Sequence, residues 1–179
     1  MSLLGIYLND HLAGATIGLE LARRTHTQNK GNEVGRFFET LVEELTEDRD
    51  SLRSIMEALG VAANPAKTAA GWMAEKVGRL KLNGRLVGYS PLSRLEELEA
   101  LSLGVEGKLS LWRTLKLAAE AEERLAGVDL DRLVGRAERQ RAGIERLRVV
   151  AATEAFGRRP SPKQQSRKPQ QPRRSPTSR

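Results

Sequence analysis

Few residues of this chain carry side chains suited to catalysis or to metal binding. Its 179 residues include no cysteine and only two histidines, His11 and His26. Without thiols there can be no disulfide, thiolate nucleophile or thiolate metal ligand. The most unusual acid is Asp48, because it falls at an apolar position of a helical repeat. Unpaired burial of a carboxylate costs much free energy, so we predict that Asp48 and His11 are core polar residues with partners.

Several interpretations of Asp48 are open. Its partner could be His11 or an arginine from another helix. A His–Asp pair could transfer protons or bind a metal, whereas a buried ion pair would only fix the register of the helices. Asp48 could also lie at the rim of a helical bundle. Gln140 falls near an apolar position of the last predicted helix, and we expect it to make a similar polar contact.

The repeat that contains Asp48 predicts a helix over residues 33–59. Its apolar residues recur alternately four and three positions apart, so they share one helix face. Asn32 stands where an N-cap belongs, and Gly60 where a left-handed stop belongs. The helix is acidic, with eight acids against three arginines. The apolar stripe consists of Val34, Phe38, Leu41, Leu45, Leu52, Ile55 and Leu59.

The same spacing, together with cap signals, predicts four further helices. Ser90-Pro91 is a strong start signal, and Asp129 should cap the last helix. We expect a kink near Gly104, with two shorter helices as the alternative. No strand pattern occurs, so residues 1–156 should form one all-α domain, an up-down bundle of about five helices. The further helices are predicted over residues 2–24, 64–82, 91–125 and 129–156, with Trp72 and Trp112 as packing residues.

This layout of long helices, with an Asn32-capped acidic second helix and a polar group in the core, resembles the ferritin-like four-helix bundles. The di-iron site of that family uses two Glu-x-x-His motifs and two further glutamates. Here Leu8 and Arg23 stand three residues before His11 and His26, so both motifs are absent. The resemblance therefore implies a bundle without the metal centre and without a cofactor. Carboxylates that could form an atypical site are Glu20, Glu44 and Glu75.

Residues 7–15 (YLNDHLAGA) and 90–99 (SPLSRLEELE) are also similar to an uncharacterised bacterial helical family. This similarity would cover most of residues 1–156. It implies a helical body and no particular activity.

Residues 157–179, which we call the C-terminal arm, differ from the body in charge. The chain has 30 Lys and Arg, and eight of them lie in the arm, which has no acid. The body therefore has 22 basic residues against 23 acids. Rich in Pro, Ser and Gln, the arm cannot bury enough apolar surface to offset its chain entropy, so we expect disorder. Its basic residues are Arg158, Arg159, Lys163, Arg167, Lys168, Arg173, Arg174 and Arg179.

The arm is the feature with the most direct class of partner. Its cations could neutralise the phosphates of nucleic acid without reading sequence, and acidic proteins or anionic lipid would serve equally well. A purely solubilising arm is the alternative. Neither a nucleophile elbow nor a phosphate-binding loop occurs. We therefore expect a cytoplasmic, non-enzymatic interaction protein without a membrane span; a ferritin-like metal-binding protein or oxidoreductase is the second hypothesis. Helix faces left open for solvent or self-association include Arg132, Arg136 and Arg139.

Overall fold

The computed structural model describes residues 2–64 and 89–157, which form four long helices and no strand. The prediction of an all-α helical bundle is confirmed. The predicted helix over residues 64–82, Trp72, Glu75 and the basic residues of the arm lie outside the described residues. The helices are α1 (Leu3–Gln28), α2 (Glu33–Ala58), α4 (Pro91–Ala118) and α5 (Leu130–Phe156), with a short 3₁₀ helix, η1 (Glu123–Leu125), before α5.

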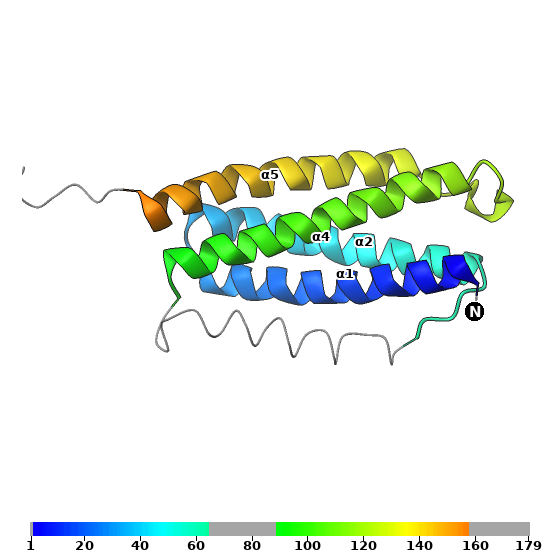
Figure 1. Ribbon diagram of the computed structural model, residues 1–179, viewed down its shortest axis with the longest axis horizontal. Coiled ribbons are helices and arrows are strands. Elements are labelled where there is room, and N and C mark those ends of the chain that lie inside the picture. Colours follow the sequence, from blue (N-terminus) through cyan, green and yellow to red (C-terminus); the bar gives the residue numbers. More distant parts are fainter. Residues whose placement is uncertain (1, 65–88, 158–179) are drawn as a thin grey trace, which may run out of the picture.

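The four helices lie lengthwise against one another (Figure 1). α1 packs against α2 and α4 packs against α5, while α1 and α4 join the two pairs. α2 and α5 complete the ring but touch at few positions. Neighbouring helices run antiparallel, whereas α2 and α4 point the same way (Figure 1). An up-down order of five helices requires this relation between its second and fourth members.

Side-chain caps start the helices at the predicted positions. Asn32, Ser90 and Asp129 each accept a hydrogen bond from the backbone N–H three residues further on, at 3.0, 3.1 and 2.9 Å. Each bond satisfies one of the N–H groups that have no partner within the helix. Gly60 has a φ of +67° after α2, the left-handed conformation that was expected of it as a stop.

Two helix boundaries differ from the prediction because of contacts between helices. α1 continues past Arg24 to Gln28, since Thr25 is buried and its hydroxyl bonds both Leu21 and the Glu97 carboxylate. α4 is unbroken through Gly104 and ends at Ala118, so the alternative of two shorter helices is wrong. The chain turns after Ala118, and Leu125 of η1 enters the core.

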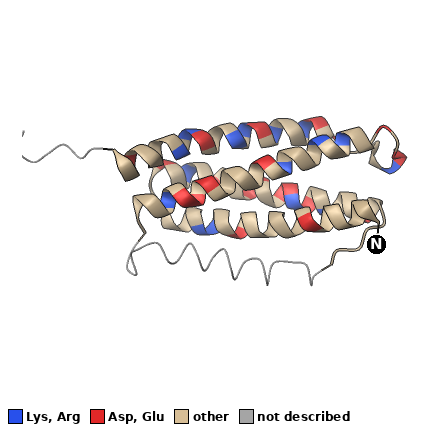
Figure 2. Cartoon of the chain, in the orientation of Figure 1, with Lys and Arg blue, Asp and Glu red and all other residues tan. Residues whose placement is uncertain are grey.

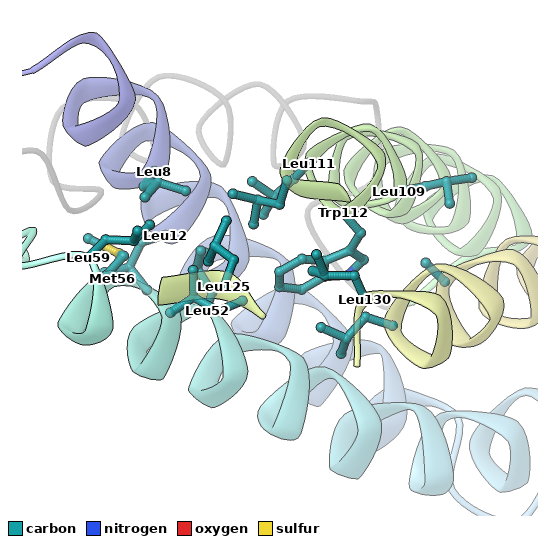
Figure 3. Packing of buried hydrophobic residues seen from close by; sticks show 14 residues of the cluster. Leu8, Leu12, Leu52, Met56, Leu59, Leu109, Leu111, Trp112, Leu125 and Leu130 are labelled. Carbon is teal, nitrogen blue, oxygen red and sulfur yellow. The ribbon is translucent and has the colours of Figure 1, made fainter. Parts of the chain in front are cut away.

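The hydrophobic core has two clusters, one towards each end of the bundle. The cluster near the N-terminus of α1 is drawn in Figure 3, where Trp112 of α4 lies close to Leu130 of α5. Trp112 is 1% exposed, which confirms its predicted packing role. Phe38 of α2 is fully buried in the other cluster. Burial of a large side chain contributes about 1.5–3 kcal/mol, so these clusters provide most of the drive to fold.

Two asparagines of α1 hold the chain on either side of residues 65–88. Near the start of the helix, Asn9 donates to the carbonyl of Ala62 at 3.2 Å and accepts from the N–H of Asn64 at 2.7 Å. At its far end, Asn29 donates to the hydroxyl of Tyr89 at 2.8 Å. The chain therefore leaves the described bundle at one end of α1 and re-enters at the other.

Charges of both signs alternate along the outer faces of α4 and α5 (Figure 2). Many of them form exposed ion pairs between helices, such as Arg113 with Glu138 and Arg141 with Glu106. Exposed pairs of this kind contribute little to stability, about 0–1 kcal/mol each. None of the described helices is both long enough and apolar enough to cross a membrane.

Candidate functional site

A group of charged side chains separates the two apolar clusters at the centre of the bundle. We call it the central charge cluster. On α2 and α4 it lies between residues of the two clusters, for example between Leu41 and Leu52 on α2. The cluster comprises Asp48 of α2, Lys108 of α4 and Arg136 and Gln140 of α5, with Glu44 and Glu47 at its rim.

Asp48 is 3% exposed and lies between two cations. Its Oδ1 is 2.5 Å from Nη2 of Arg136, and its Oδ2 accepts a hydrogen bond from Nζ of Lys108 at 2.5 Å. Both charged partners are themselves largely buried, with side chains 6% and 12% exposed. The buried carboxylate is thus matched by an arginine and a lysine from two other helices.

Gln140 completes the network by using both ends of its amide. Its oxygen accepts from Lys108, and its nitrogen donates to Glu44 at 2.8 Å and to Asp48 at 3.3 Å. Arg136 also donates to Glu47 at 2.5 Å, which connects the buried pair to the surface. Three carboxylates therefore face two cations, and one neutral amide lies between them.

Burial lowers the pKa of Lys108, and the nearby charge of Asp48 opposes this effect. Desolvation acts in this direction because a low-dielectric environment disfavours an ammonium ion. The lysine is held by two acceptors, Asp48 and Gln140, so its amine is engaged rather than free for attack. The geometry is that of a structural ion-pair network, which is one known source of shifted pKa values.

The cluster is poorly suited to hold a metal. Two cations occupy the oxygens of Asp48, and a divalent ion there would meet their repulsion. No group of three or more histidines, aspartates and glutamates with ligand geometry occurs among the described residues. Of the carboxylates considered for an atypical site, the two that the structure describes are not brought together: Glu44 bonds Gln140, while Glu20 pairs with Arg23 on the surface.

His11 is not a partner of Asp48. It lies half-buried on α1 with its ring edge-on to Tyr7, the centroids 4.5 Å apart, and burial lowers its pKa. The alternative prediction was that an arginine from another helix pairs with Asp48, and the structure shows this pairing with Arg136 of α5. Arg136 was interpreted as a solvent or interface residue, and this is wrong because it lies buried beside Asp48. Its neighbours Arg132 and Arg139 are exposed.

A second buried carboxylate, Glu97 of α4, lies where α1 ends and was not singled out in the sequence. It is 2% exposed and accepts from the hydroxyls of Thr25 at 3.0 Å and Tyr89 at 2.9 Å. Arg24 lies 3.2 Å away. Desolvation raises the pKa of Glu97, while the hydrogen bonds lower it. Desolvation also raises the pKa of Tyr89 to about 12.

Spacing alone could have indicated these residues. Glu97 begins a row of residues four apart that continues through Leu101 and Val105. Arg136 starts a similar row with Gln140 and Ile144. Residues four apart share a helix face, so polar members of such rows are candidates for burial.

Comparisons with family models, curated proteins and solved structures gave no match to this chain.

Proposed function

We propose that this protein is a non-enzymatic interaction protein: a helical bundle that carries a basic C-terminal arm for sequence-independent contact with polyanions. The observation that carries the proposal is the separation of charge. The arm has eight Lys and Arg and no acid, against 22 basic and 23 acidic residues in the body. The absence of cysteine supports a cytoplasmic location.

Within residues 2–64 and 89–157, few cationic sites would compete with the arm. Most basic residues of this part pair with acids: Arg94 with Glu154, Lys116 with Asp131, and the buried Arg136 with Asp48. A polyanion would have to compete with these carboxylates. The arm has no such acids in its own sequence, so its cations are the natural counterions for phosphates.

The chemistry of the bundle supports a non-enzymatic role over the ferritin-like alternative. Its central polar group is an ion-pair network in which Asp48 is matched by Lys108 and Arg136. Because these charged groups pair with one another, the network favours a structural role. Stoichiometric iron, manganese or zinc in the purified protein would favour the alternative instead.

The test uses the full-length chain and a labelled random-sequence DNA duplex. In the test variant all eight basic residues of the arm are replaced by Gln. We expect the wild type to bind weakly at low salt, with a log–log salt slope of about −7 if all eight cations contact phosphates. The arm variant should lose this binding, and duplexes of different sequence should bind equally well.

The matched control replaces Lys30 and Arg139, two exposed cations of the body, by Gln in the wild-type chain. It should keep most of its affinity. The proposal is wrong if the wild type does not bind at low salt, or if the arm variant binds as well as the wild type. Binding only to anionic vesicles, and not to DNA, would assign the arm to lipid surfaces.

A further inference from the structure

We infer that the groove between α2 and α5 is a docking site for the protein's own C-terminal arm, which thereby competes with external polyanions. Docking is inferred from the surface hollows and the charges of the bundle. Its effect on polyanion binding rests on the proposed function. The inference identifies a surface, its occupant and the consequence for binding.

The backbones of α2 and α5 approach each other at few positions, and surface hollows lie at both ends of the seam between them. Between the hollows, side-chain contacts such as Arg136 with Glu47 join the two helices. The larger hollow, about 640 Å³, is lined by the apolar residues Ile55, Val128 and Leu133. Its charged lining consists of three acids and one cation: Glu47, Asp50, Asp129 and Arg132. The smaller hollow, about 250 Å³, has residues 150, 151 and 154 in its wall, close to the point where the arm begins.

Negative charge collects on this side of the bundle. α2 has eight acids against three arginines, a net charge of −5, while the charges of α1 and α4 balance and α5 has two more arginines than acids. Three acids of α2, Glu39, Glu43 and Glu57, are exposed and form no ion pair with any described residue. With Glu47 and Asp50 they make a row at spacings of three, four and seven along one helix face. The uncompensated acids of α2 complement a segment of eight cations.

The arm is long enough to follow the seam. The arm begins at Gly157, directly after α5, and the larger hollow includes Leu133. These two residues lie 24 positions, or about 36 Å, apart along the helix. An extended Pro-rich chain rises about 3.1 Å per residue, so roughly 12 residues cover that distance. An arm turning back along the groove would bring residues near Pro169 to the larger hollow. Arg173 and Arg174 follow directly.

Docking would lower the arm's apparent affinity for other polyanions. If only a tenth of the molecules have a free arm, the apparent affinity for DNA falls about tenfold. Tethering favours the internal contact, because a short flexible link gives an effective concentration in the millimolar range. Salt weakens both contacts, since each depends on charge.

The direct test places a nitroxide label in the larger hollow of the full-length protein. Ser54 is exposed and lines that hollow, and the chain lacks cysteine, so Ser54→Cys gives a single attachment point. The readout is the NMR spectrum of the backbone amides, whose signals a nearby nitroxide weakens by paramagnetic relaxation. At low salt we expect the label to weaken the amide signals of the arm, most strongly at Gln170 and Gln171. The control label is placed on α4 through Ser110→Cys, which is also exposed, and should leave the arm unaffected. High salt should restore the signals.

A second test compares two triple variants with the same change in net charge. Glu39, Glu43 and Glu57 are changed to Gln in one, and Glu20, Glu99 and Glu106 of α1 and α4 in the other. The first should abolish the attenuation and raise DNA affinity several-fold more than the second. Equal gains in affinity would show a general charge effect and overturn the inference.

The outcomes separate the two proposals. DNA binding without attenuation by the Ser54 label, or with equal attenuation by both labels, refutes docking in this groove and leaves the proposed function standing. Selective attenuation in a protein that binds no polyanion supports docking and refutes the proposed function. Selective attenuation that added DNA relieves supports both.

Discussion

Replacing Asp48 by Asn should destabilise the bundle far more than the same replacement at a surface aspartate. Asp48 is 3% exposed, and the change leaves Lys108 and Arg136 as two buried cations with reduced compensation. Removing one partner of a buried ion pair typically costs about 3–5 kcal/mol. We expect the lower end, about 3 kcal/mol, because Glu44 and Glu47 remain close to the site.

The assays are urea unfolding and thermal unfolding, both followed by far-ultraviolet circular dichroism at neutral pH. A loss of about 3 kcal/mol should lower the melting temperature by roughly 6–12 °C in a domain of this size. The control is Asp50→Asn, two residues away, whose side chain is 55% exposed and pairs with Arg49. That change should stay within about 0.5 kcal/mol of the wild type.

A double variant tests the cause of the loss. Adding Lys108→Met to Asp48→Asn removes one uncompensated cation and keeps a side chain of similar shape, so part of the lost stability should return. Replacing a whole buried pair by apolar groups is often neutral or stabilising. The assignment of the central charge cluster is refuted by either of two results. The first is that Asp48→Asn lowers the free energy of unfolding no more than Asp50→Asn does. The second is that the double variant loses as much stability as the two single changes, Asp48→Asn and Lys108→Met, added together.

Three further outcomes can be measured in the same way. Because the folded-state pKa of Glu97 is raised above its ordinary value of 4.5, its contribution to stability is present below that value and is lost as pH rises. The wild type should therefore lose stability relative to Glu97→Gln as pH rises above 4.5. Tyr89 has its pKa raised to about 12 from 10.0, so the wild type should lose stability relative to Tyr89→Phe as pH rises above about 10. In Gly143→Ala the new Cβ would lie 2.5 Å from Cζ of Phe37, and we expect a loss of about 1–3 kcal/mol by urea unfolding, whereas Gly135→Ala on the same helix meets nothing closer than 3.6 Å and should gain up to about 1 kcal/mol.

The local features of this fold could be predicted from the sequence because they depend on neighbouring residues. Asn32 and Asp129 cap their helices through N–H groups three positions away, and Gly60 stops α2 by its own backbone conformation. The helical phase of Asp48 is likewise a local property, so its place in the seam followed from spacing alone. The end of α1 could not be predicted in this way, because it depends on a bond from Thr25 to Glu97, 72 positions along the chain.

The partners within the candidate site were harder to predict for the same reason. Asp48 is bonded to residues 60 and 92 positions further on, and a sequence gives no direct measure of which helices meet. His11 was a reasonable partner by residue type, but its own helix places it beside Tyr7. Arg136 looked like a surface residue because arginine seldom lies buried without a paired charge, and that charge comes from another helix.

The two asparagines at the ends of α1 have a consequence for engineering the molecule. Asn9 and Asn29 lie 20 residues, or about 30 Å, apart, and 24 residues of chain join the positions that they hold. A flexible chain of that length has a mean end-to-end distance of about 24–29 Å, so an unstructured linker could bridge the gap with little stretching. The bundle of α1, α2, α4 and α5 should therefore accept a foreign sequence between Asn64 and Tyr89, so that this position can be used to insert other segments.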